Sequence, residues 1–203
     1  MRKRISIFGK STVHENEMSY KIIKELAYRL VTDGNVCMHG GYAGGIMQAV
    51  SDGAQSAIDE CNLDINLNIG VPEIRFDEKW PRVPTATFTE PAIDIYDRLR
   101  IITQSDIFVV APSGGDGTLL ELNIVIHENT INELLGKPVK TIVCIEGPDN
   151  KWSNLFQSRL DNLDISKNMV TQYSWISFIK YGNQDSVDQI VHQIIKKINQ
   201  IDT

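Results

Sequence analysis

The chain has 203 residues, of which 42% are hydrophobic and 23% are charged, and its formal net charge is −6. This is an ordinary globular composition, and the length suits one domain with a substantial core. The acidic balance argues against duplex-DNA binding, which depends on neutralising phosphates. No apolar run approaches the roughly twenty residues of a membrane span. We therefore expect neither nucleic acid nor a membrane as a partner.

The N-terminal residues are basic, but the apolar stretch that follows them breaks at Gly9-Lys10. We therefore interpret residues 4–8 as a first strand and not as part of a secretion signal. The three cysteines, Cys37, Cys61 and Cys144, are odd in number and lack C-x-x-C spacing. This pattern favours free thiols in a reducing cytoplasm over a disulfide framework or a zinc site.

Apolar spacing predicts the remaining elements. Residues 18–32 place apolar side chains every three or four positions, which predicts an amphipathic helix that Asp33-Gly34 ends. The same reasoning predicts later strands at 35–39, 65–71, 85–89, 106–111, 139–145 and 175–179. It predicts later helices at 45–60, 92–104, 117–135, 152–160 and 185–200, and a loop at 72–84.

This alternation of strands and helices, with nearly continuous apolar strands, predicts a parallel sheet covered on both faces. No linker, repeat or low-complexity segment interrupts the pattern. We therefore expect a single α/β domain over residues 1–203, a Rossmann-like doubly wound sheet with helices on both faces. Ligands in such sheets bind at the carboxyl ends of the strands, where loops lead into helices.

A first glycine-rich loop, residues 39–47, joins a predicted strand to a predicted helix and contains Gly40, Gly41 and Gly45. Glycine permits positive φ and close approach of a ligand to the backbone. The helix N-terminus beyond the loop offers N–H groups and partial positive charge to a phosphate. The alternative is a tight turn whose glycines serve only packing, and the loop alone does not decide between the two.

A second glycine-rich loop, residues 112–121, follows the most apolar strand and opens a helix. The N–H groups of Gly114, Gly115 and Gly117 and the hydroxyl of Thr118 form a candidate anion cradle. The loop lacks the Gly-Lys-Ser/Thr of a P-loop and the spacing of G-x-G-x-x-G, so a dinucleotide is not favoured.

Two charged residues accompany the second loop. Glu121 lies three residues after Thr118, on the same helix face and about one turn behind the cradle. Its alternative role is to complement the helix dipole. Arg98 lies on the preceding helix, whose first half should project toward the same edge of the sheet. There it could pair with Glu121 or contact a ligand, although a helix arginine is usually solvated.

These segments together resemble the Lonely Guy (LOG) family of nucleoside 5′-monophosphate phosphoribohydrolases, often labelled possible lysine decarboxylases. Residues 114–121 resemble its P-G-G-x-G-T-x-x-E signature, with Ser113 in place of the proline, and residues 94–98 are similar to its D-M-H-E-R. Residues 7–12, 39–47 and 136–139 also look like family segments, and the similarity runs from about residue 4 to 160. Tyr42 and Lys10 stand where the family has glycines.

The resemblance implies hydrolysis of the N-glycosidic bond of a nucleoside 5′-monophosphate, without metal or cofactor. Glu121 would stabilise positive charge at the anomeric carbon or activate water, and Arg98 would hold Glu121 or contact the substrate. The second loop would grip the 5′-phosphate, with further contacts from Ser11 and Lys10, and Tyr96 would flank the base. The four histidines show no metal-ligand spacing, and we interpret them as structural.

Other functions remain open. Related folds resemble molybdenum-cofactor carrier proteins, and the Tyr42 and Lys10 departures favour a non-catalytic nucleotide or cofactor binder as the main alternative. Sugar transfer to a second base, as in deoxyribosyltransferase-like enzymes, is a weaker alternative. The resemblance also implies a homodimer, with the helices at 92–104 and 118–135 as its surfaces. The loop at 72–84, with Trp80 and three cations, either closes over the ligand or simply crosses the surface.

Overall fold

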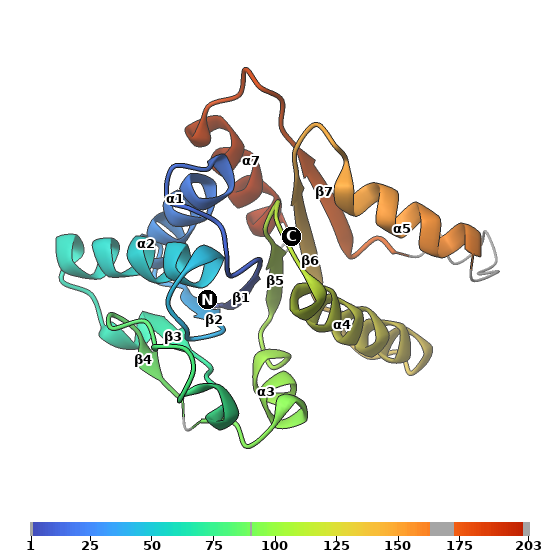
Figure 1. The fold of residues 1–203 in the computed structure, drawn as a ribbon. Coiled ribbons are helices and arrows are strands. Elements are labelled where there is room, and N and C mark those ends of the chain that lie inside the picture. The colour runs from blue at the N-terminus through green and yellow to red at the C-terminus, as the bar shows by residue number, and fades with distance from the viewer. Residues whose placement is uncertain (1, 90, 163–172, 201–203) are drawn as a thin grey trace.

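The structure is a computed structural model that describes residues 2–89, 91–162 and 173–200. Within these residues, seven strands form one parallel sheet in the order β4-β3-β2-β1-β5-β6-β7. Helices α1, α2 and α7 cover one face of the sheet, and α4 and α5 cover the other (Figure 1). The predicted Rossmann-like, doubly wound parallel sheet is therefore confirmed.

The elements follow the predicted alternation, and most of their ends lie within three residues of the predicted ends. The strands are β1 (Arg4–Phe8), β2 (Val36–His39), β3 (Asn68–Gly70), β4 (Thr87–Phe88), β5 (Ile107–Val110), β6 (Thr141–Glu146) and β7 (Ile176–Lys180). The α-helices are α1 (Met18–Thr32), α2 (Gly45–Cys61), α3 (Ile95–Ile102), α4 (Asp116–Leu134), α5 (Lys151–Asn162) and α7 (Val187–Asn199).

The strand predicted at residues 65–71 is shorter than expected. The side chain of Asp64 accepts a hydrogen bond from the backbone N–H of Asn66 at 2.9 Å, which starts a 3₁₀ turn at Ile65–Leu67. Only Asn68–Gly70 then pair in the sheet. The apolar alternation of this segment reflects a buried turn followed by a short strand. A second 3₁₀ turn, Ile74–Phe76, lies inside the predicted loop at 72–84.

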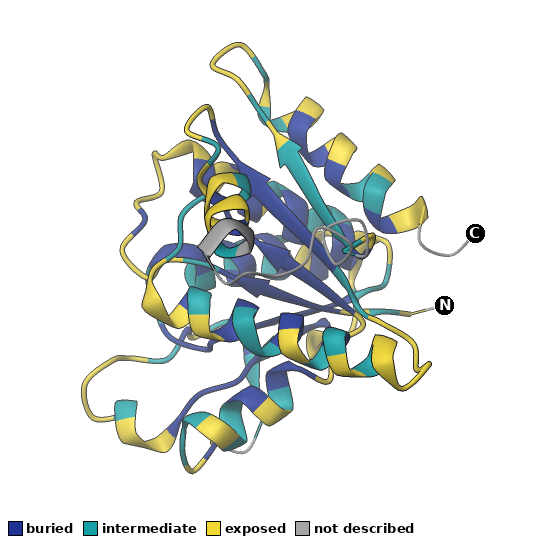
Figure 2. Cartoon of the chain, turned by 90° about the vertical axis from the view of Figure 1, so that its right-hand side faces the viewer, coloured by how far each residue is buried: buried dark blue, intermediate teal, exposed yellow. Residues whose placement is uncertain are grey.

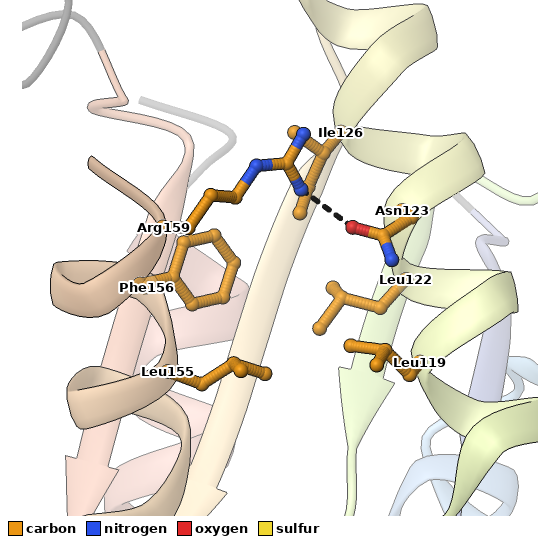
Figure 3. Close-up of a pocket in the computed structure, with 7 residues that line it drawn as sticks. All are labelled: Leu119, Leu122, Asn123, Ile126, Leu155, Phe156 and Arg159. Atoms are coloured by element: carbon orange, nitrogen blue, oxygen red, sulfur yellow. Dashed lines mark hydrogen bonds between the residues drawn. The ribbon is translucent and has the colours of Figure 1, made fainter. Parts of the chain in front are cut away.

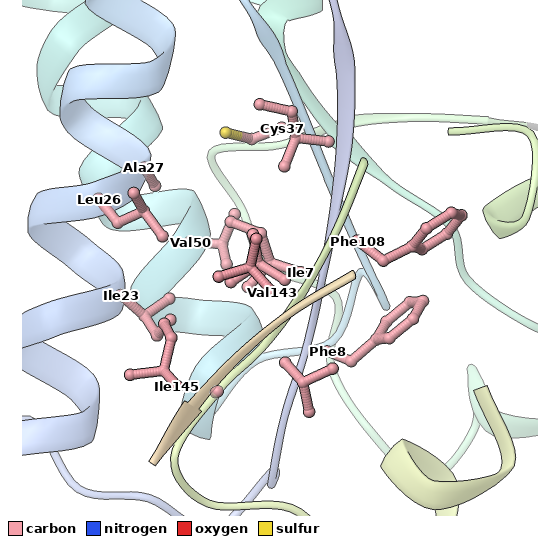
Figure 4. Packing of buried hydrophobic residues seen from close by; sticks show 14 of the residues in the cluster. Ile7, Phe8, Ile23, Leu26, Ala27, Cys37, Val50, Phe108, Val143 and Ile145 are labelled. Atoms are coloured by element: carbon pink, nitrogen blue, oxygen red, sulfur yellow. The ribbon is translucent and has the colours of Figure 1, made fainter. Parts of the chain in front are cut away.

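The core lies on both sides of the central strands, because successive strand side chains point to opposite faces. Ile7 faces Ile23 and Leu26 of α1, whereas Phe8 and Phe108 point to the other side of the sheet (Figure 4). The Phe8 and Phe108 ring centroids are 5.6 Å apart. In Figure 2 the central strands are buried, the edge strand β7 is intermediate and the helices expose their outer faces, which is the layering expected of this fold.

The topology predicts the position of a ligand site. Strand β1 pairs with β2 on one side and with β5 on the other, so the order of strands reverses between β1 and β5. In open α/β sheets, ligands bind beyond the carboxyl ends of the strands at this switch point. The segments that leave β1, β2 and β5 there include the two glycine-rich loops. Within the part of the chain that the structure describes, no helix is long and apolar enough to span a bilayer.

Candidate functional site

A cavity of about 530 Å³ opens at the switch point between β1 and β5. Its walls come from residues 7–12 at the end of β1 and just after it, from the first glycine loop, from residues 76 and 80 of the loop at 72–84, and from residues 115–118 and 121. Arg98 reaches it from α3. The two glycine loops, which lie more than sixty positions apart in the sequence, therefore line one cavity.

Lys10 connects three of these segments through its backbone. Its N–H donates to the carbonyl of Ser113 at 2.9 Å, and its carbonyl accepts from the N–H of Ile46 at 3.0 Å. Gly45 is required at this junction, because its φ is +56° and a Cβ there would lie 2.2 Å from the Lys10 carbonyl oxygen. Gly45 therefore packs the loops together and does not line the cavity.

The glycines of the second loop divide into two kinds. A Cβ on Gly114 would lie 2.7 Å from the ring of Trp152, whose indole N–H donates to the Ala111 carbonyl at 2.9 Å. A Cβ placed on Gly115 or on Gly117 would have no atom of the described residues within 4 Å, apart from the adjoining residues and the nearby backbone of the same helix. Neither has a positive φ, so neither packing nor backbone conformation requires a glycine at these two positions.

Gly115 and Gly117 border the cavity at the N-terminus of α4. Gly115 is the N-cap residue, and its position provides no side-chain cap to the helix. The first backbone N–H groups of a helix have no partner within the helix, and they carry its partial positive charge. The site therefore combines N–H donors with space beside the backbone, which is what an anionic group needs to approach closely.

Glu121 and Arg98 meet in the same cavity. The Glu121 Oε1 atom lies 3.5 Å from a terminal nitrogen of Arg98, and both side chains are mostly buried. Arg98 also donates from Nε to the carbonyl of Val71 at 3.1 Å, which fixes its direction. Burial raises the pKa of Glu121 above its ordinary value, and the Arg98 charge opposes this effect only in part.

The first glycine loop makes room for that arginine. A Cβ on Gly40 would lie 2.5 Å from an Arg98 terminal nitrogen. Just before it, His39 is buried, accepts from the Gly41 N–H at Nδ1 and pairs with Asn68 through Nε2. Burial lowers the pKa of His39 to about 4, so this histidine is neutral and holds the loop in place. This placement agrees with its interpretation as structural.

Eight of the predicted site residues line the cavity: Lys10, Ser11, Gly40, Gly115, Gly117, Thr118, Arg98 and Glu121. Gly41, Gly45 and Gly114 lie behind it, where a side chain would strike neighbouring atoms. Tyr96 is 79% exposed and does not line the cavity. The structure therefore gives no support for the contact with a base expected of Tyr96.

One wall of the cavity is aromatic, and only part of this wall was predicted from the sequence. Tyr42, Phe76 and Trp80 line it together, with the Phe76 and Trp80 centroids 5.0 Å apart. Phe76 was not singled out in the sequence, although an aromatic pair four residues apart in a loop with several cations was the available signal. The loop at 72–84 thus contributes to the site and is not only a surface crossover.

A second cavity, of about 290 Å³, lies between α4 and α5 (Figure 3). Its polar groups are those of Arg159 and Asn123, which hydrogen-bond to each other, and the rest of its lining is apolar. It lies on a different face of α4 from Thr118 and Glu121. Because it contains neither glycine loop, we place the candidate site in the first cavity. Among the described residues, no group of three or more His, Cys, Asp or Glu side chains is arranged to hold a metal ion.

Comparisons with known proteins show the family to which the chain belongs. The model of the SLOG cluster4 family matches residues 2–159, which include every segment that lines the cavity. The chain belongs to the SLOG cluster4 family. A search of curated proteins finds no match. The resemblance to the LOG family is thus confirmed at the level of the SLOG group, while membership of the LOG family itself stays a prediction.

Solved structures with the same fold extend the comparison. The molybdenum cofactor binding protein of Rippkaea orientalis is 18% identical, with a TM-score of 0.64 and 98% of each chain covered. The Moco carrier protein of Chlamydomonas reinhardtii is 15% identical, with a TM-score of 0.62 over 98% of this SLOG chain and 99% of the carrier. The single-stranded-DNA-binding DNA processing protein A of Helicobacter pylori is 12% identical, with a TM-score of 0.52 over 96% and 81% of the two chains. At these identities the likeness concerns the fold.

Proposed function

We propose that this protein binds a phosphorylated small molecule, either a nucleotide or a pterin phosphate of the molybdenum-cofactor class, and acts as a binding or carrier protein. The phosphate would lie at the N-terminus of α4, against the backbone of Gly115 and Gly117. The cavity is large enough for a ligand of this class, because small-molecule sites begin at about 300 Å³.

The open space beside Gly115 and Gly117 supports the proposal most directly. Gly117 lies inside the first turn of α4, where glycine costs about 0.5–1 kcal/mol of helix stability relative to alanine. Since no neighbouring atom requires its small size, we attribute the glycine to close approach by a ligand. Both the cofactor-binding protein of R. orientalis and the carrier protein of C. reinhardtii share this fold, which supports a binder.

The test is ligand binding by wild type and by Gly117→Ala. We expect ribose 5-phosphate and AMP to raise the melting temperature of wild type, because a ligand that binds only the folded state stabilises it. Gly117→Ala should be as stable as wild type or more stable, yet bind at least tenfold more weakly by calorimetry. Leu120→Ala, on the exposed side of the same helix, is the matched control and should bind as wild type does. Equal affinity in Gly117→Ala would contradict the proposal.

A second candidate is the LOG-like reaction, and the Arg98–Glu121 pair favours it. In that reaction a water molecule would add to C1′ of a nucleoside 5′-monophosphate and lose a proton. The base would leave with a proton, and ribose 5-phosphate would remain. A carboxylate with a raised pKa is a stronger base than an ordinary one, which suits Glu121 to the removal of the water proton. Arg98 would position that carboxylate.

Incubation with AMP, GMP, CMP and N6-substituted AMP separates the two candidates. Release of free base by wild type, reduced at least a hundredfold in Glu121→Gln, would support hydrolysis. Binding of the same compounds without release of base would support the carrier. Equal release by wild type and Glu121→Gln would remove Glu121 from the mechanism.

Two further properties are proposals. We propose that the protein is a homodimer, because α4 exposes several large apolar side chains on its outer face. We also propose a cytoplasmic location, since the three cysteines are free thiols and two of them are buried.

A further inference from the structure

The cavity has an aromatic wall, which consists of Tyr42, Phe76 and Trp80. The three rings pack edge to face, with centroids 6.2 Å apart for Tyr42 and Phe76, 5.0 Å for Phe76 and Trp80 and 6.5 Å for Tyr42 and Trp80. In this packing the edge of one ring meets the face of its neighbour, so the three rings do not stack face to face. The Lys79 ammonium lies 4.9 Å from the Trp80 centroid, over one face of the indole.

A set of backbone contacts holds this wall in place. The Tyr42 hydroxyl donates to the carbonyl of Glu73 at 2.6 Å and accepts from the Glu73 N–H at 2.8 Å. The Ala43 N–H donates to the Pro81 carbonyl at 2.8 Å, and the Val83 N–H donates to the Gly41 carbonyl at 3.0 Å. The aromatic segment is thus fixed at both ends to the first glycine loop.

The exposure of Trp80 needs an explanation. It is 43% exposed, whereas the other two tryptophans, Trp152 and Trp175, are almost fully buried. Because the segment that carries it is held in place, the exposed indole of Trp80 at the cavity wall can stack on a planar ring of a ligand. The same cavity contains the N-terminus of α4, the basic residues Lys10 and Arg98 and the acidic residues Asp116 and Glu121, and Arg98 is paired with Glu121. Its lining therefore suits a ligand that carries both an anionic group and a planar ring.

We propose that Trp80, supported by Phe76 and Tyr42, stacks on the planar heterocycle of the ligand and sets the preference for ring-bearing phosphates. This inference rests on the proposed function, since it assumes a phosphate at α4. The ligand class is then a phosphate ester of a planar nitrogen heterocycle, such as a purine or a pterin. Tyr42 is a positioning residue, because it acts by fixing the aromatic segment.

The experiment compares ribose 5-phosphate, which lacks a ring, with AMP, GMP, flavin mononucleotide and a pterin monophosphate. Calorimetry would measure affinities for wild type, Trp80→Leu and Trp80→Phe. We expect wild type to bind at least one ring compound at least tenfold more tightly than ribose 5-phosphate. Trp80→Leu should lose about tenfold in that affinity, equivalent to about 1.4 kcal/mol, and Trp80→Phe should recover most of it. Affinity for ribose 5-phosphate should stay unchanged in both variants.

Two controls complete the design. Ile74→Ala changes an apolar side chain of the same segment that is 57% exposed and does not line the cavity, and it should leave all affinities unchanged. Ring binding should also quench tryptophan fluorescence in wild type and fail to do so in Trp80→Phe.

The outcomes separate this inference from the proposed function. If wild type binds ribose 5-phosphate and every ring compound with equal affinity, the phosphate site stands and the stacking role of Trp80 is overturned. If Trp80→Leu weakens both kinds of ligand equally, Trp80 only supports the cavity, and the inference is again overturned. If wild type binds none of these compounds, the proposed function and this inference fail together.

Discussion

At the scale of single residues, Glu121 is a buried carboxyl group whose pKa is raised. The charge of Arg98 lowers the cost of ionising it, but burial is the larger effect. A carboxyl whose pKa is higher in the folded state than in the unfolded state stabilises the fold while it is protonated. That contribution is present at low pH and is lost as the pH rises through the folded pKa.

We therefore expect Glu121→Gln, which stays neutral, to be more stable than wild type at about pH 8 and to lose this advantage near pH 4. Melting temperatures of the two proteins across this range measure the difference. A stability difference that does not change with pH would show that the carboxyl is solvated well enough to keep an ordinary pKa.

His39 has the opposite dependence on pH. Its pKa is about 4 in the folded protein against an ordinary 6.5, because burial disfavours its charged form. The neutral ring therefore contributes stability at neutral pH that is lost as the pH falls from about 6.5 to 4, on the order of 3 kcal/mol in full. We expect His39→Gln to flatten the fall in unfolding free energy over this range, as measured by urea denaturation. An unchanged slope would mean that another group governs acid sensitivity.

At the scale of elements, the Tyr42 hydroxyl holds the segment between residues 73 and 83 to the first glycine loop. Tyr42→Phe keeps the ring but leaves the N–H and carbonyl of Glu73 without this partner. Loss of a buried hydrogen-bonding partner costs about 1–3 kcal/mol. We expect faster hydrogen exchange and faster proteolysis within residues 73–83, while exchange in β5 and β6 stays unchanged. An equal increase in hydrogen exchange across the whole sheet would show that residues 73–83 do not open independently of the sheet.

The elements themselves were predictable from the sequence to different degrees. Helix α1 matches its predicted bounds, because its apolar spacing is regular and Asp33-Gly34 ends it. The strand predicted at 65–71 was only partly right, since alternation cannot reveal that the Asp64 side chain starts a turn. Spacing placed Arg98 and Glu121 at the same edge of the sheet, and the structure brings them together.

The roles of the glycines could not be predicted in the same way. Gly114 and Gly117 look equivalent in the loop sequence, yet one packs against Trp152 and the other borders open space. The distinction depends on a tryptophan nearly forty residues away. The aromatic wall was predicted only in part. Closure of the Trp80 loop over the ligand was one of two alternatives, but the contacts that join Tyr42 to this distant backbone segment do not follow from the sequence.

At the scale of the whole molecule, α4 exposes Leu120, Ile131 and Leu134, which helical spacing places on one side, and the C-cap residue Leu135 is exposed as well. Large exposed apolar surfaces on a folded protein commonly mark an interface. We expect light scattering after gel filtration to give the mass of a dimer. Ile131→Glu with Leu134→Glu should give a monomer that still melts cooperatively. A wild-type monomer at micromolar concentration would contradict the dimer.

The backbone hydrogen bonds of Lys10 bear on the affinity of the protein for its ligand. Since this one residue hydrogen-bonds to the segments that follow β2 and β5, the cradle is assembled before anything enters it. A ligand that enters a preorganised cradle loses little affinity to the ordering of loops. Even a minimal fragment, such as inorganic phosphate, should then occupy the cradle at millimolar concentration and show fast exchange in NMR titrations. Larger phosphate esters would then bind with their phosphate at the same position.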